Sequence, residues 1–158
     1  MTRYPWMRNF SVFIATAGPV GYLPIAPGTW GSGLAILFWW FAMRNLPITG
    51  YLLILFIITA AAVWSSTQAE KSLGHDSGHI VIDEIAGQLT GLLICPRSIS
   101  FAVLGFFIFR LFDIWKPEPI NASQKLPQGW GVVTDDILAG IYTAVVLIII
   151  SFLWSRYG

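Results

Sequence analysis

Five apolar segments follow one another along the chain, separated by polar or turn-rich connections. They cover Gly33–Met43, Ile48–Ser65, about Ile80–Cys95, about Ile99–Trp115 and Ile137–Trp154. None of them alternates apolar with polar residues at a period of two, which argues against a barrel. Because a backbone in hydrocarbon must satisfy its own hydrogen bonds, we expect helices. The pattern predicts an all-α fold, an integral membrane helical bundle with about five membrane-embedded helices.

The first apolar segment is short for a span of about 20 residues. We expect it either to be extended by Thr29–Ser32 or to enter the membrane at a slant. A preceding stretch carries Trp6, Phe10 and Phe13. We interpret it as an uncleaved N-terminal interfacial helix, with a cleaved signal peptide as the alternative. The chain shows no linker and no repeat, so residues 1–158 are expected to form a single membrane domain.

The composition also indicates a membrane protein. Of the 158 residues, 56% are hydrophobic and only 11% are charged, whereas a soluble domain has about 25% charged residues. The net charge of +1 gives no strong field for nucleic acid, which we do not expect as a partner. Cys95 is the only cysteine, so an internal disulfide and a cysteine metal cluster are both excluded.

The basic residues predict the orientation of the bundle. If all the apolar segments cross, five basic residues fall on one side and three on the other: Arg3, Arg8, Lys71, Lys116 and Lys125 against Arg44, Arg97 and Arg156. The positive-inside rule places the richer side in the cytoplasm. The three long connections fall on that same side, where a site could be built: Gly18–Ser32, Ser66–His79 and Lys116–Thr134.

Five acidic residues lie at the expected cytoplasmic ends of the last three segments. Asp83 and Glu84 begin the third segment, Asp113 ends the fourth, and Asp135 and Asp136 begin the fifth. Since successive helices alternate in direction, these ends meet at one depth and the carboxylates converge. Carboxylates gathered near hydrocarbon repel one another unless a cation joins them. Mg²⁺ prefers oxygen ligands of this kind, so the sequence predicts a magnesium site.

Each of these acidic groups also has a purely structural interpretation. Asp135 or Asp136 could cap the fifth helix, where the helix dipole favours an anion. Asp113 could serve only as the partner of Arg110, three residues earlier. Asp83 and the residue after it could form a hydrated helix terminus.

Cationic groups lie among the carboxylates. Arg110, Asp113 and Lys116 follow at intervals of three residues and share one helical face, and Pro117 predicts that the helix ends near Lys116. Arginine suits bidentate phosphate recognition, whereas lysine supplies a point charge. Snorkelling to the interface is an equally good interpretation of Lys116.

Two further segments carry weaker signals. The Gly-rich segment Ala26–Gly33 precedes a helix, where backbone N–H groups can bind an anion, and it adds the hydroxyls of Thr29 and Ser32. His75 and His79 are four residues apart and could ligate a metal on a helix. The glycines between and before them favour a loop and ordinary polar packing instead.

Four stretches of the chain, in order, resemble the phosphatidylglycerophosphatase A family. They are PIAPGTWGS (Pro24–Ser32), IVIDEIAG (Ile80–Gly87), FRLFDIWKPEPI (Phe109–Ile120) and GWGVVTDDILAG (Gly129–Gly140), and the resemblance covers about residues 20–142. It implies a Mg²⁺-dependent phosphatase of bacterial phospholipid synthesis, a multi-pass protein of the inner membrane. Its substrate would be phosphatidylglycerophosphate in the lipid bilayer, and its products phosphatidylglycerol and inorganic phosphate.

The family's motifs fall on residues already singled out from their chemistry. We expect catalytic roles for Asp83, Glu84, Asp113 and Asp136, metal ligation by these four and Asp135, and phosphate binding by Arg110, Lys116, Thr29 and Ser32. Either water bound at the metal or an aspartate would attack the phosphorus. The alternative function is a carboxylate-lined cation transporter or channel subunit. Its carboxylates should form a relay across the bilayer rather than a cluster at one face.

Overall fold

The regular structure of the chain is helical throughout the described residues. The computed structural model describes residues 5–75 and 77–157, with side chains from Phe10 onward. The elements are the α-helices α1 (Pro5–Ala15), α2 (Pro27–Phe38), α3 (Ile48–Leu73), α4 (Ile82–Gly91), α5 (Ile99–Trp115), α6 (Ile120–Ser123) and α7 (Gly129–Tyr157), the 3₁₀ turn η1 (Val20–Tyr22) and the π-helical turn η2 (Trp39–Met43). The predicted all-α fold is confirmed.

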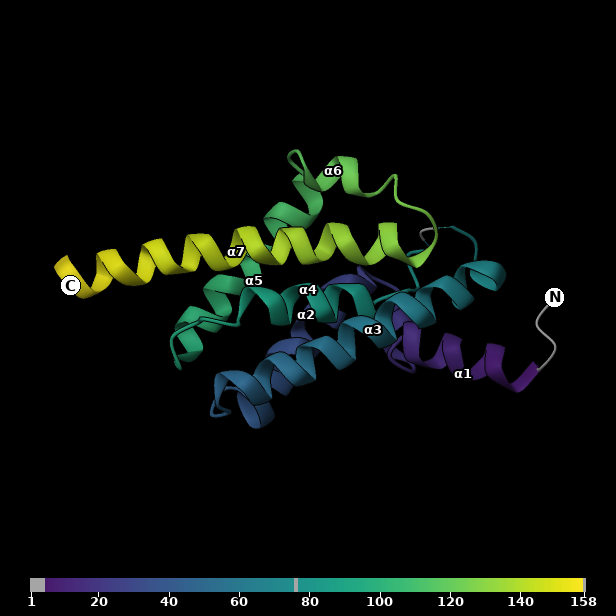
Figure 1. Cartoon of the computed structure of the whole chain (residues 1–158), viewed down its shortest axis with the longest axis horizontal. Coiled ribbons are helices and arrows are strands. Elements are labelled where there is room, and N and C mark those ends of the chain that lie inside the picture. The colour runs from purple at the N-terminus through teal and green to yellow at the C-terminus, as the bar shows by residue number, and fades with distance from the viewer. Residues whose placement is uncertain (1–4, 76, 158) are drawn as a thin grey trace.

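Helix α4 lies in the middle of the bundle (Figure 1). It contacts α7, α2, α3, α5 and α1, and eight of its ten residues are buried. Helix α7 crosses α4 where glycines meet: a Cβ built on Gly140 would lie 2.2 Å from the carbonyl oxygen of Gly87. Small residues at such a crossing let two helix backbones approach closely. The residues of α4 are therefore held firmly against α7.

Helices α3 and α7 form the long axis of the molecule (Figure 1). In the part of the chain that the structure describes, these two helices are long and apolar enough to cross a membrane. They run in opposite directions, and Gly129 at the start of α7 packs against Val63 and Thr67 of α3. Their outer faces expose large apolar side chains such as Phe56 and Phe152. Membrane association accounts for such surfaces.

The other expected membrane segments are shorter. Helix α2 begins at Pro27 and continues into η2, so it includes the extension expected for the first segment, and α5 has the predicted bounds. Helix α4 has only ten residues, which correspond to about 15 Å, roughly half the thickness of the hydrocarbon core. Five membrane-embedded helices therefore remain a prediction.

Two helices extend into segments that we expected to be loops. Helix α3 continues to Leu73, because Ala69 is buried in a small apolar cluster with Ala15, Ile80 and Val132. Helix α7 begins at Gly129 and not near Ile137. Its first glycines resemble turn residues in the sequence, but they allow the close contact with α3.

The N-terminal stretch forms helix α1, as expected. Phe10 and Phe13 are exposed on it, which suits an interfacial helix. Arg3 lies outside the described residues, and so do the side chains of Trp6 and Arg8.

Candidate active site

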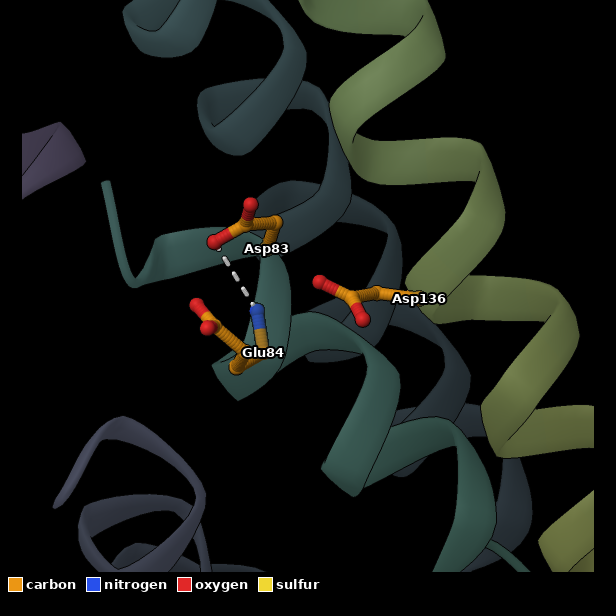
Figure 2. A group of neighbouring side chains, drawn as sticks. All are labelled: Asp83, Glu84 and Asp136. Carbon is orange, nitrogen blue, oxygen red and sulfur yellow. Dashed lines mark hydrogen bonds between the residues drawn. The ribbon is translucent and has the colours of Figure 1, made fainter. Parts of the chain in front are cut away.

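Three carboxylates from two helices meet between α4 and α7. Asp83 and Glu84 belong to the first turn of α4, and Asp136 extends toward them from α7 (Figure 2). Each residue offers one oxygen atom, and these three oxygens lie within 4.8 Å of one another. Residues more than fifty positions apart in sequence thus form one group, as the alternation of helix directions predicts.

This group is buried and its hydrogen bonding is incomplete. Only 6% of Asp83 and 4% of Asp136 is exposed. Oδ1 of Asp83 accepts a hydrogen bond of 3.0 Å from the backbone N–H of Glu84. By contrast, Oε2 of Glu84 and Oδ1 of Asp136 are buried without a hydrogen-bond partner. Buried anionic oxygens of this kind are costly unless a cation compensates them, so the group fits a divalent metal ion.

The other two predicted carboxylates are paired with basic side chains. Asp113 Oδ2 lies 2.6 Å from Arg110 Nη1, and Asp113 Oδ1 lies 3.8 Å from Lys116 Nζ. Asp135 Oδ2 accepts hydrogen bonds from Lys116 Nζ and, at 3.1 Å, from Gln124 Nε2. The same arginine also reaches Glu84, with 3.9 Å between Nη1 and Oε1. Arg110 therefore lies between Glu84 of the buried group and Asp113, and Lys116 lies between Asp113 and Asp135.

Lys116 reaches α7 because α5 ends as predicted. Helix α5 ends at Trp115, and Lys116 follows in the left-handed conformation with φ of 47°. The N–H of Lys116 still donates to the carbonyl of Phe112, and Pro117 prevents further helix. A non-glycine residue is strained in this conformation, so the surrounding contacts must hold it. One such contact is the bond from Lys116 to Asp135.

The charges influence one another throughout the site. Burial raises the pKa of Asp83 to about 6, although hydrogen bonds from Glu84 oppose the shift. Burial and the charge of Asp83 raise the pKa of Glu84 well above its usual range. Asp83 and Glu84 both belong to α4, which is not one of the two helices that are long and apolar enough to cross a membrane. Burial lowers the pKa of Lys116, but the bond to Asp135 and the nearby carboxylates outweigh it and raise that pKa.

The structure bears on the purely structural interpretation of each acidic residue. Asp135 and Asp136 lie in the second turn of α7 and cannot cap a helix that begins at Gly129. Asp83 is buried and does not belong to a hydrated terminus. Asp113 does pair with Arg110, and this pair is in turn part of the larger charged group.

The Gly-rich segment reaches the site through a backbone contact. Gly28, in the first turn of α2, lies so close to Glu84 that a Cβ built on it would be 1.8 Å from Oε1. Ser32 is fully buried and its hydroxyl donates to the carbonyl of Gly28, within its own helix. Thr29 is half-buried. Phosphate binding by these two hydroxyls remains a prediction, and for Ser32 the hydroxyl hydrogen is already engaged.

Two contacts in the site escaped the sequence analysis. The segment containing Gly28 indicates N–H groups for an anion, whereas its steric contact with Glu84 depends on how α2 packs against α4. Gln124 lies in a connection without a distinguishing pattern, and nothing in the sequence indicates its bond to Asp135.

The two histidines take part in separate contacts. His75 Nδ1 lies 2.7 Å from a carboxylate oxygen of Glu70. His79 Nδ1 lies 2.8 Å from the carbonyl oxygen of Gly21, and its ring stacks on Tyr22. These are the packing roles that the sequence favoured over metal ligation.

Long apolar helices around a buried acidic group that lies beside basic side chains are what a membrane-associated enzyme acting on a phosphorylated substrate requires. A family model described as phosphatidylglycerophosphatase A matches residues 13–151. No solved structure matches the chain.

Individual relatives agree with the family model. A protein named phosphatidylglycerophosphatase A from Escherichia coli is 39% identical over 151 residues, covering 94% of this chain and 87% of that protein. Its namesake from Haemophilus influenzae is 33% identical over 84% of this chain and 83% of its own length. A Bacteroides thetaiotaomicron protein, provisionally named a phosphatidylinositol-3-phosphatase, is 34% identical over 86% of this chain and 90% of its own. The chain belongs to the phosphatidylglycerophosphatase A family and is a lipid phosphatase.

Proposed function

We propose that the protein hydrolyses the terminal phosphomonoester of phosphatidylglycerophosphate, with Mg²⁺, to give phosphatidylglycerol and inorganic phosphate. The observation that carries the proposal is the buried group of Asp83, Glu84 and Asp136, with cationic side chains beside it. Family membership supports the choice of substrate. The step belongs to bacterial phospholipid biosynthesis.

Asp83, Glu84 and Asp136 would hold the metal ion. Their oxygens are close enough to share one cation, and two of the buried oxygens lack any other partner. An all-oxygen ligand set favours Mg²⁺ over zinc, which prefers nitrogen and sulfur. When bound, the ion would neutralise phosphate oxygens and the charge that develops during transfer. Asp113 and Asp135, predicted as further ligands, are occupied by basic side chains and would support the site from outside.

Arg110 and Lys116 would hold the phosphate. Arg110 forms an ion pair with Asp113 through Nη1, and neither its Nε nor this Nη1 has a hydrogen-bond partner. The guanidinium therefore keeps a donor for a phosphate oxygen, and its pairing with Asp113 fixes its orientation. Lys116 lies at the partly exposed edge of the group and adds a point charge. The attacking oxygen would come from water or from one of the aspartates.

We further propose that residues 1–158 act as one membrane domain of the bacterial inner membrane. Helices α3 and α7 would cross the bilayer, and α2 with η2, α4 and α5 would be embedded beside them. The acidic group lies where α7 and α4 begin. Placing this end at the cytoplasmic surface agrees with the positive-inside rule. A lipid headgroup could then reach the metal without its acyl chains leaving the leaflet.

The rival functions make different predictions. A cation transporter would need carboxylates along a path across the bilayer, whereas the described ones cluster beside Arg110 and Lys116, and membership of a phosphatase family does not favour it. The name of the Bacteroides thetaiotaomicron relative raises phosphatidylinositol-3-phosphate as another phosphomonoester substrate.

Phosphate release by the purified protein tests this proposal. The protein, in detergent micelles with Mg²⁺, is given either phosphatidylglycerophosphate or phosphatidylinositol-3-phosphate at equal surface concentration. We expect a higher kcat/KM for phosphatidylglycerophosphate. A preference for the inositol lipid would overturn the substrate assignment, and the absence of phosphate release from both would overturn the phosphatase assignment.

A further inference from the structure

A second charged recess lies at the far end of the bundle from the carboxylates. It forms where η2 ends, α3 begins and α4 ends, which is the opposite end of α4 from Asp83 (Figure 1). Its volume is about 220 Å³. Its walls include the aromatic side chains of Trp39 and Tyr51, and two arginines line it, Arg44 and Arg97. The proposed hydrolysis uses none of these residues.

Among the described residues, no acidic side chain pairs with the positive charge in this recess. No carboxylate lines it, and within the described ranges no ion pair involves either arginine. The sequence offers few candidates, since no acidic residue precedes Glu70 and none lies between Glu84 and Asp113. Nε of Arg44 is buried and has no hydrogen-bond partner. An unpaired, partly buried cationic group is costly, so the recess favours an anion.

The surroundings hold the guanidinium of Arg44 in place. Its central carbon lies 3.7 Å from the centroid of the Trp40 ring, a cation–π contact that fixes the guanidinium plane. Ile48 also lines the recess and begins α3, whose N-cap Pro47 makes no side-chain capping bond. The negative ends of η2 and α4, which also lie at the recess, oppose the positive end of that helix dipole, so the charge that favours an anion comes from the two arginines. A simple snorkelling arginine requires neither the stacked geometry nor a recess.

We propose that this recess binds a phosphate group, held by Arg44 and Arg97, at a site separate from the catalytic centre. The guanidinium groups of arginines match phosphate oxygens in geometry, and the aromatic walls offer these groups few other hydrogen-bond acceptors. Phe41 of η2, three residues before Arg44, is exposed, and so are Leu52 and Leu53 in the first turns of α3. Apolar surface for acyl chains is therefore close by. The phosphate comes from a phospholipid of the leaflet opposite the active site or from free inorganic phosphate, and both sources share this chemistry.

Binding to the purified full-length protein tests the proposal. Phosphatidylserine is the lipid probe, because it is an anionic phosphodiester that is neither substrate nor product of the proposed reaction. Phosphatidylcholine is the zwitterionic comparison, and inorganic phosphate is the third arm. Each is titrated in detergent while the shift in Tm is followed. Arg44→Gln and Arg97→Gln remove the proposed ligands, and Arg156→Gln is the matched control, an exposed arginine outside the recess.

We expect phosphatidylserine to raise the Tm of the wild type and of the Arg156→Gln control more than phosphatidylcholine does. In Arg44→Gln and Arg97→Gln the half-saturating concentration should rise by about tenfold, the effect of losing one charge-assisted contact. The same dependence on arginine with inorganic phosphate alone would identify free phosphate as the source. Equal responses in all the variants, or no response to either probe, would overturn the proposal. If Arg44→Gln does not fold, Arg44→Lys together with the exposed Arg97→Gln gives the same comparison.

Discussion

Replacing Gly28 by alanine should disable the site without disturbing the fold. A Cβ at this position would lie 1.8 Å from Oε1 of Glu84, whereas real Cβ contacts essentially never fall below 3.0 Å. The carboxylate oxygen must therefore retreat by about 1.2 Å or more, while metal–ligand distances tolerate only about 0.2 Å. Because the displaced atom is the end of a flexible side chain, the cost in stability is small. Alanine also favours helix over glycine by about 0.5–1 kcal/mol.

A misplacement of about 1 Å in a catalytic group costs about 10²-fold in rate, so we expect kcat/KM of Gly28→Ala to fall by about that factor. Gly33→Ala is the matched control, since it lies in the same helix and a Cβ there meets no atom within 4 Å. Phosphate release from phosphatidylglycerophosphate measures activity, and thermal unfolding measures stability. Wild-type kcat/KM for Gly28→Ala would refute the placement of Glu84 in the site. A loss of activity in both variants would point to an effect on the helix and not on the carboxylate.

Three further predictions concern the carboxylates, the arginine and the orientation. Asp83→Asn and Asp136→Asn should each lower kcat/KM by about 10²-fold or more. The double variant should lose little activity beyond the worse single variant, because the two residues act as a unit. Additive losses of activity that follow the loss in Tm would indicate separate structural roles. Arg110→Lys keeps the charge but loses the fork, so we expect a roughly tenfold loss in kcat/KM with unchanged Tm, and wild-type kinetics would remove it from phosphate binding. A cysteine at the exposed Leu126, in a Cys95→Ala background, should resist an impermeant thiol reagent in intact cells, and labelling from outside would reverse the proposed orientation.

Much of the site could be predicted because helix direction and loop length determine which ends meet. That reasoning brought Asp83, Glu84 and Asp136 together correctly. It could not separate them from Asp113 and Asp135, because the division depends on how far Arg110 and Lys116 reach. The left-handed conformation of Lys116 determines which carboxylates its side chain can contact. Pro117 predicts that the helix ends near Lys116, but it does not predict this left-handed conformation.

The bounds of a helix could be predicted where apolar residues mark its ends. They could not be predicted where packing against another helix determines its ends. Helix α5 is apolar along its length and has the expected bounds. The start of α7 at Gly129 was missed, since glycine is a poor helix former and its use here depends on contact with Val63 of α3. The extension of α3 to Leu73 was missed for a similar reason, because small residues such as Ala69 pack there against another helix and give no long apolar run.

The central claim is that a cation held by Asp83, Glu84 and Asp136 is required for phosphatidylglycerophosphate hydrolysis. The most direct test is phosphate release by protein stripped with a chelator, its metal content verified, during titration with Mg²⁺. We predict no turnover in the stripped wild type, recovery as Mg²⁺ is added, and little or no recovery in Asp136→Asn at any concentration. Full activity after verified metal removal would contradict the claim, and so would an Asp136→Asn variant that recovers along the wild-type curve.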